Sequence, residues 1–246
     1  PGRAGRIHGV RSAERPGQER ASVYTIVTAE NWIGQLPQTV REAIEARMTV
    51  IDVPAGEEIK RAGEPVLRMH QVVSGYIKLT GLHEDGRQSL ITIYAPGNCF
   101  SETALVSRRP THHHTSVALT AVRLRVLSVQ DFWEVYYRYP EVPEALCRKF
   151  AGAISRQMSA REQRATVRLG KRVAMMFENL AELCAERRIG SRVTIAVPIT
   201  QSDIADHFDV TRQSIQREIT ALKSAGVIDK HDGRWIVRDM TKLARV

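Results

Sequence analysis

The feature that most limits the fold of this chain is a change of periodicity near residue 130. From Met48 to Ser128 the sequence consists of short β-branched or aliphatic runs separated by turn residues, such as "MTVIDV", "YIKLTGL" and "SLITIYA". Short strands at this spacing are typical of an antiparallel sandwich or barrel, and Asp85-Gly86 marks the clearest hairpin turn. From Gln130 onward the apolar residues recur at the spacing of helices. We therefore expect an α+β chain with an antiparallel β domain first and helical elements after it.

The same pattern predicts four segments in the 246 residues, which are enough for two domains with separate cores. Residues 1–22 are rich in Arg and poor in apolar residues, which predicts a disordered basic N-terminal arm. Residues 23–140 form the β domain with flanking helices, residues 141–166 one long helix, and residues 167–246 a second domain.

The long helix carries an apolar stripe at four-residue steps among charged residues. One face must therefore be buried, but a helix that lies on its own β domain and a self-association helix show the same pattern. The spacing leaves both interpretations open. The stripe consists of Leu146, Phe150, Ile154 and Met158.

The segment "ITQSDIADHFDVTRQSIQREITALKSAGVI" carries most of the functional information. Thr200 and Asp203 predict a capped short helix, and a second helix begins near Thr211. Two short helices joined so closely must cross steeply, which is the geometry of a helix-turn-helix. The following "VIDKHDGRWIVRD" predicts two strands around Asp232-Gly233, which would form a β wing.

The second of these helices has the chemistry of a major-groove reader. Its buried stripe is expected at Ile215, Ile219 and Leu222, which leaves a polar face exposed near the N-terminus. Arg presents two donors to guanine, Gln pairs with adenine, and hydroxyl groups bind phosphates. Together with a net charge of +9, this face predicts double-stranded DNA as a partner. The expected contact residues are Thr200, Gln201, Ser202, Thr211, Arg212, Gln213, Ser214, Gln216 and Arg217.

The β domain, the long helix and "TQSDIADHFDVTRQSIQREITALKSAGVI" together resemble the family of the cyclic-AMP receptor protein and the fumarate and nitrate reduction regulator, the Crp/Fnr family. The resemblance covers roughly residues 30–240. It implies a β-roll sensor with a cyclic-nucleotide-binding-like jelly roll, a dimerisation helix and a C-terminal winged helix-turn-helix. It also implies a transcription regulator that binds a near-palindromic operator as a homodimer joined along the apolar stripe, with RNA polymerase as a further partner. Members commonly have Glu after the first Arg of the recognition helix, whereas Gln213 stands here and favours adenine over cytosine.

The effector pocket that the resemblance implies is altered in this chain. Members that bind cyclic AMP resemble "G-E-L-A-L … R-S-A", in which Glu meets the ribose and Arg the phosphate. In this chain Glu102 is kept, Ser101 replaces the glycine, and the Arg-Ser pair falls on His112 and His113. Neutral imidazole cannot replace a bidentate cation on a phosphate. The expected pocket residues are Ser101, Glu102, Thr103, His112, His113, His114, Gln157 and Met158, the last two at the positions of the adenine-binding hydroxyl residues.

These changes predict a regulator that cyclic AMP does not control, with no cofactor and with either no effector or a different one. A metal- or haem-sensing regulator that uses His112–His114, with His70 or His83 as a further ligand, is an alternative. A cupin-like metalloenzyme is a weaker alternative, because no carboxylate follows His114 in "TSVAL". We expect no enzyme and no metal, since no Gly-rich phosphate loop, nucleophile elbow or HExxH motif is present.

Cysteine usage and hydropathy add expectations about the cellular setting. Cys99, Cys147 and Cys184 are widely spaced, which argues against a disulfide framework or a zinc knuckle and predicts packed thiols in a cytoplasmic protein. Residues 1–98 contain no cysteine that could hold an oxygen-sensing iron–sulfur cluster. No apolar run is long enough to span a bilayer, so we expect no membrane partner.

Overall fold

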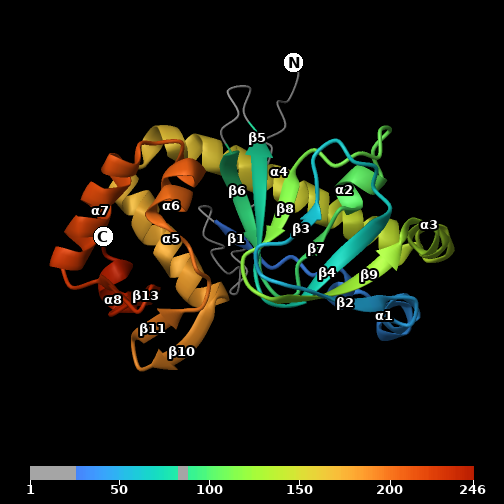
Figure 1. Ribbon diagram of the computed structural model, residues 1–246, viewed down its shortest axis with the longest axis horizontal. Helices are drawn as coiled ribbons and strands as arrows, with labels where there is room; N and C mark the ends of the chain where they lie inside the picture. The colour runs from blue at the N-terminus through green and yellow to red at the C-terminus, as the bar shows by residue number, and fades with distance from the viewer. Residues whose placement is uncertain (1–25, 83–87) are drawn as a thin grey trace, which may run out of the picture.

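The computed structural model describes residues 26–82 and 88–246. In that part of the chain a β-roll is followed by a long helix and a winged helix-turn-helix, so the predicted α+β fold is confirmed (Figure 1). The expected N-terminal arm at 1–22 and the hairpin turn at Asp85-Gly86 lie outside the described residues.

The strands of the β-roll follow one another closely along the chain. They are β1 (Val27–Thr28), β2 (Thr49–Val53), β3 (Glu58–Lys60), β4 (Arg68–Ser74), β5 (Ile77–Leu82), β6 (Gln88–Tyr94), β7 (Cys99–Phe100), β8 (Thr115–Ala118) and β9 (Val122–Ser128). Within the described residues, two sheets form the roll, with strand orders β1-β6-β5-β8-β3 and β2-β9-β4-β7. Neighbouring strands are antiparallel, except that β1 runs parallel to β6.

Buried and exposed side chains alternate along the strands, and the buried ones form a core that the two sheets share. In β9, "VRLRVLS", Val122, Leu124 and Val126 are buried, while the residues between them are more exposed. These side chains meet Val72 and Phe100 from the other strands in one apolar cluster. The core of the β-roll therefore lies between its two sheets.

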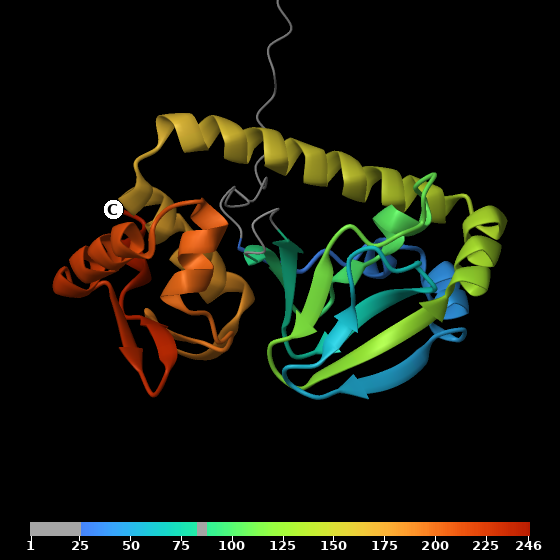
Figure 2. The ribbon, with the colours of Figure 1, turned by 45° about the horizontal axis from the view of Figure 1, so that its top comes forward.

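Short helices flank the roll: η1 (Ile33–Gln35), α1 (Gln38–Glu45), α2 (Glu102–Leu105) and α3 (Val129–Arg138). Ser128 caps the start of α3, because its hydroxyl accepts a hydrogen bond from the backbone N–H of Asp131 at 3.0 Å. Helix α3 ends before Pro140, and α4 (Glu141–Thr166) begins directly after that proline. Helix α4 then runs along the length of the molecule and passes over both domains (Figure 2).

The apolar stripe of α4 divides into two parts. Leu146 is 2% exposed and belongs to the core formed with α3 and the roll, and Phe150 packs partly against the same core. Ile154 and Met158 are 61% and 69% exposed. The expectation that Leu146 contributes to a dimer interface is wrong, because its own chain already encloses it. The first half of the stripe therefore packs on the chain's own β domain, and the second half is exposed.

The second domain is a helical unit with a small sheet. Its elements are α5 (Leu169–Leu183), β10 (Ala185–Ile189), β11 (Arg192–Ile195), α6 (Gln201–Phe208), α7 (Arg212–Ser224), β12 (Ile228–His231), β13 (Arg234–Val237) and α8 (Met240–Leu243). The sheet has the order β10-β11-β13-β12. The predicted wing is confirmed, since β12 and β13 pair around Asp232 and Gly233, both of which have positive φ. The β10–β11 hairpin was not predicted, because every residue of "AERRI" is exposed and the strand lacks apolar alternation.

The core of this domain centres on Trp235. Its indole is fully buried, lies edge-on to Phe177 with ring centroids 5.2 Å apart, and donates a hydrogen bond from Nε1 to the Ile199 carbonyl oxygen at 3.0 Å. The predicted buried stripe of α7 is confirmed, since Ile215, Ile219 and Leu222 are all in the core. The inward face of α6 joins the same core through Ile204, Ala205 and Phe208.

Two smaller expectations concern cysteines and membranes. Cys99 and Cys184 are buried free thiols as expected, but Cys147 is exposed on α4, so the expectation of a packed thiol is wrong there. In residues 26–82 and 88–246, none of the helices combines the length and the apolar character that crossing a bilayer requires.

Candidate nucleic-acid interface and sensor pocket

Helix α6 has a fully formed N-terminal cap. The Thr200 hydroxyl accepts a hydrogen bond from the backbone N–H of Asp203 at 3.1 Å, and the Asp203 carboxylate accepts one from the backbone N–H of Thr200 at 2.9 Å. This reciprocal pair is a capping box, which satisfies donors that a helix start leaves without a partner. The cap therefore fixes where α6 begins, and with it the positions of Gln201 and Ser202.

A three-residue turn joins α6 to α7. Asp209 ends α6 in the left-handed conformation, with φ 54°, and Thr211 caps α7 by accepting from the backbone N–H of Ser214 at 3.2 Å. Val210 lies between them and packs partly against the domain core. The short turn and the two caps make the crossing of α6 and α7 a consequence of local sequence.

The predicted DNA-contact residues gather on one surface at the N-terminal ends of these two helices. Thr200, Ser202, Thr211, Arg212, Gln213, Gln216 and Arg217 are exposed, and Gln201 and Ser214 are partly exposed. The Glu218 carboxylate lies 3.4 Å from the Arg217 guanidinium. The face is thus available to a ligand, and α7 lies at the outer end of the molecule (Figure 1).

A groove in this surface adds a residue that the sequence analysis missed. It is lined by the N-terminal residues of α6, by Arg212 of α7 and by Lys230 of the wing strand β12. The Lys230 ammonium lies 4.8 Å from the centroid of the Trp235 ring, which holds it beside the helices. Its position two residues before the predicted wing turn was the signal that could have identified it.

A second cavity, of about 420 Å³, lies between the β-roll, α4 and α6. Of the predicted pocket residues it brings together Ser101, Glu102 and Gln157. Thr103 and Met158 are exposed elsewhere, and the histidine triplet is not part of the cavity wall. Ser101 has φ 81°, a left-handed conformation that suits the glycine it replaces in the family pattern.

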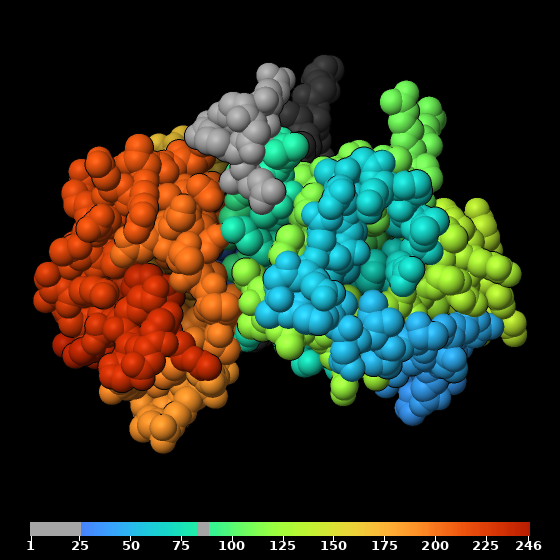
Figure 3. All heavy atoms as spheres, viewed as in Figure 1, coloured from blue at the N-terminus to red at the C-terminus, as the bar shows by residue number. Residues whose placement is uncertain are grey.

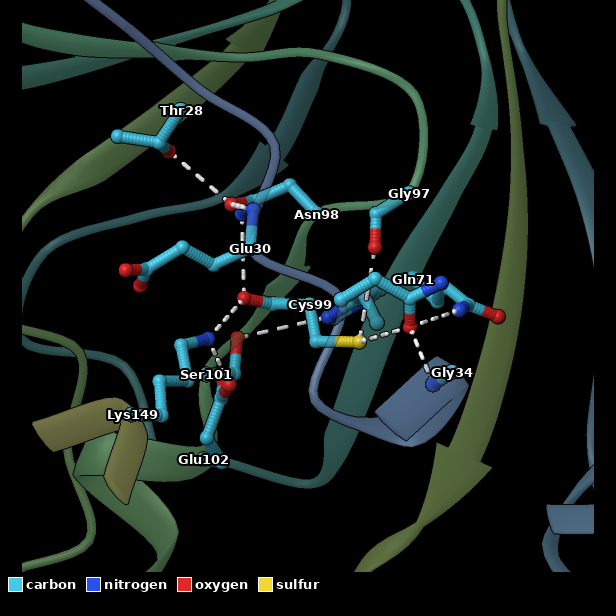
Figure 4. A network of polar contacts seen from close by, with 12 residues as sticks. Thr28, Glu30, Gly34, Gln71, Gly97, Asn98, Cys99, Ser101, Glu102 and Lys149 are labelled. Carbon is cyan, nitrogen blue, oxygen red and sulfur yellow. Dashed lines mark hydrogen bonds and ion pairs between the residues drawn. The ribbon is translucent and has the colours of Figure 1, made fainter. Parts of the chain in front are cut away.

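Charged residues of α4 form ion pairs with the acidic groups of this cavity, and Figure 4 shows Lys149 beside Glu102. The Lys149 ammonium forms an ion pair with Glu102, which is 1% exposed, and donates a hydrogen bond to the Cys99 carbonyl oxygen at 2.6 Å. Arg156 forms an ion pair with Glu30. The carboxylate that the resemblance assigns to ribose binding is therefore occupied by a residue of the same chain, which the sequence analysis did not anticipate.

His70 and His112 are buried in the roll, whereas His113 is exposed. Burial lowers the pKa of His112 to about 4 and that of His70 to about 3, so both imidazoles are neutral near pH 7. His70 stacks on Phe100 with ring centroids 4.7 Å apart, and Lys60 lies 5.7 Å from the centroid of the same ring. In the described residues no three His, Cys, Asp or Glu side chains are grouped so that they could hold a metal ion.

Two family models match this chain, one on each domain. The cyclic nucleotide-binding domain matches residues 50–139, and the Crp-like helix-turn-helix domain matches residues 171–246. The chain belongs to the Crp/Fnr family of transcription regulators.

Known members of the Crp/Fnr family agree with this over most of the chain. A CRP-like cAMP-activated global transcriptional regulator of Mycobacterium tuberculosis is 25% identical over 82% of this chain and 90% of its own length. The nitrogen fixation regulation protein FixK of Rhizobium meliloti is 27% identical over 74% of this chain and 78% of its own. The solved structure of FixK2 from Bradyrhizobium japonicum, at 20% identity, has a TM-score of 0.68 over 80% of this chain and 96% of its own, which supports the fold.

As a Crp/Fnr regulator, this chain combines an intact DNA-binding module with a divergent sensor pocket. The helix-turn-helix keeps its caps, its buried stripes and its exposed N-terminal face. In the pocket Glu102 pairs with Lys149, and the neutral His112, to which the resemblance assigns the position of the Arg, lies outside the cavity wall. The two halves of the protein therefore differ in how closely they follow the family.

Proposed function

We propose that this regulator binds double-stranded DNA specifically, as a homodimer whose two α7 helices enter successive major grooves of a near-palindromic operator. The observation that carries this proposal is the exposed face at 212–217, set between the capped start of α6 and the wing. Arg212 and Arg217 contact guanine edges, and Gln213 favours adenine. Thr200, Gln201, Ser202, Thr211, Lys230 and the helix N-termini contact phosphates.

Substitution of Arg217 tests the base-reading role. Operators are first selected from random duplexes with the wild-type protein, and affinities are then measured by titration at fixed salt, because phosphate contacts depend on ionic strength. Arg217→Ala is expected to weaken operator binding by about 1–3 kcal/mol and to leave random-duplex binding nearly intact. Equal losses on both duplexes would show that Arg217 contacts only phosphate. Lys242→Ala, a change of the same charge in the C-terminal helix α8, is the matched control.

The dimer is proposed to form along the second half of α4. Ile154 and Met158 expose large apolar side chains one turn apart, and partly buried Phe150 precedes them on the same stripe. Exposed apolar side chains at four-residue steps match the seam of a two-helix interface. A two-fold axis there would place one recognition helix on each side, as a near-palindromic site requires.

We further propose that cyclic AMP does not control this regulator. Glu102 is already neutralised by Lys149, and His112 offers no charge to a phosphate near pH 7. Isothermal titration calorimetry with cyclic AMP is expected to give no measurable heat of binding up to millimolar concentrations. Micromolar affinity would contradict this part of the proposal.

The remaining parts of the proposal follow from the regulator role. The protein acts in the cytoplasm, without catalysing a reaction, and recruits or blocks RNA polymerase at its operator. Transcription in vitro from a promoter that carries the selected operator tests this, with the Arg217→Ala protein as the control. No change in transcript level on addition of the wild-type protein would contradict it.

A further inference from the structure

The β-roll and the DNA-binding domain are in direct contact within one chain. Helix α6 lies against strand β6, and strand β1 contacts both β6 and α5. In the space-filling view the orange and red second domain abuts the green part of the β-roll (Figure 3). The contact therefore involves the first helix of the helix-turn-helix and the edge of a sensor sheet.

An apolar core continues across this contact. Ile26 and Val27 of the β1 segment and Ile93 of β6 are almost completely buried, and they belong to the same cluster as Phe177 and Phe208 of the second domain. Full burial of one aliphatic side chain contributes about 1.5–3 kcal/mol. A contact of this kind restrains the orientation of the second domain as well as its distance from the first.

Two polar contacts also join α6 to the β-roll at this interface. The Lys78 ammonium of β5 lies 2.5 Å from Oδ1 of Asp203 in α6, and the two side chains are 26% and 11% exposed. On the next turn of α6, Nδ1 of His207 lies 3.3 Å from the Ile91 carbonyl oxygen of β6. Removal of either partner of a shielded ion pair is costly, because the remaining charge is left poorly solvated. The pair therefore favours the domain arrangement that keeps Lys78 and Asp203 together.

Asp203 connects the sensor domain to the recognition surface. Its Oδ1 faces Lys78, while its Oδ2 accepts hydrogen bonds from the backbone N–H and the hydroxyl of Thr200 at 2.9 and 2.7 Å. The same carboxylate thus binds the β-roll and caps α6. The three-residue turn then carries the orientation of α6 to α7, which lies on the outer side with its contact residues exposed (Figure 1).

We propose that Lys78 of the β-roll is a positioning residue for operator recognition: through Asp203 it holds α6 on β6 and so fixes the orientation of α7. This rests on the proposed function, because a fixed orientation of α7 increases operator affinity only when two recognition helices must bind two half-sites at the same time. A fixed second helix meets its half-site at high effective concentration, whereas a mobile one loses rotational freedom on binding. Lys78 need not contact DNA to act in this way.

The test compares a full operator with a duplex that carries only one half-site. Lys78→Met is expected to weaken binding to the full operator roughly tenfold, within the usual range of coupling between sites, and to leave single half-site binding unchanged. Lys78→Arg, which keeps the charge, is expected to recover most of the loss. Arg123→Met removes the same charge from an exposed ion pair with Asp52 on the β-roll and is expected to bind like the wild type.

A double variant keeps the proposal falsifiable if Lys78→Met alone fails to fold. Lys78→Met/Asp203→Asn removes the ion pair without leaving an unpaired charge, and the same selective loss on the full operator is expected. Equal losses on operator and half-site, or wild-type affinity in both variants, would overturn the positioning role. Failure of the wild-type protein itself to prefer the operator over random DNA would instead overturn the proposed function.

Discussion

Replacement of Lys149 by Met removes the ammonium that faces the buried Glu102 while keeping an unbranched side chain of similar length. Glu102 is 1% exposed and the Lys149 side chain 12%, so water solvates the Glu102 carboxylate poorly once the ammonium is removed. The Cys99 carbonyl oxygen also loses its charged donor at 2.6 Å. Removal of one partner from a buried ion pair costs about 3–5 kcal/mol. Because Lys149 keeps a small exposed fraction, we expect the free energy of unfolding to fall by about 3 kcal/mol.

Urea unfolding followed by tryptophan fluorescence measures this change, since Trp32 and Trp133 belong to the apolar core that joins the flanking helices to the β-roll. A loss of about 3 kcal/mol lowers the midpoint of the unfolding transition by roughly 1–3 M urea. Arg148→Met, at the preceding position of α4, removes an exposed pair with Glu144 and is expected to change stability by less than about 0.5 kcal/mol. The double variant Lys149→Met/Glu102→Gln is expected to regain most of the loss. A Lys149→Met protein as stable as Arg148→Met would refute the reasoning.

Three further predictions concern the roll and the long helix. Ser101→Gly is expected to raise the free energy of unfolding by about 0.5–1 kcal/mol in the same titration, because φ 81° strains any residue except glycine; a loss of stability would contradict this. Burial lowers the pKa of His70 to about 3, so at pH 5 only the unfolded state binds this proton, and stability is lost as the pH falls below about 6.5. Between pH 7 and pH 5 the free energy of unfolding of the wild type should therefore fall by about 2 kcal/mol more than that of His70→Asn. If the two proteins lose stability in parallel as the pH falls, His70 does not cause the loss. Ile154→Glu is expected to shift the protein to monomers in analytical ultracentrifugation, whereas an unchanged dimer would place the interface elsewhere.

The helix-turn-helix was predictable because the signals that define it are local. Thr200 and Asp203 lie three residues apart and form the predicted capping box, and Asp232-Gly233 supplies the positive φ values of the wing turn. Each signal concerns residues that are neighbours in the chain, so the sequence contains the geometry directly.

The sensor pocket was less predictable because its contacts are distant in sequence. Lys149 and Glu102 of the pocket are 47 residues apart, and Lys78 and Asp203, which join the two domains, are 125 apart. No local pattern shows that such residues meet. The stripe on α4 shows the same limit, because only the packed structure separates Leu146, which is buried in its own chain, from Ile154, which is exposed. The resemblance did identify Ser101 as a substitute for glycine, and the backbone there is left-handed.

The central claim is that two identical recognition helices bind successive major grooves at a fixed separation. Its most direct test is the affinity for the selected operator after about 5 bp, or half a helical turn, is inserted between the half-sites. We predict that affinity falls to that of a single half-site, because the second α7 then faces the wrong side of the duplex. Affinity unchanged by the insertion would contradict the account.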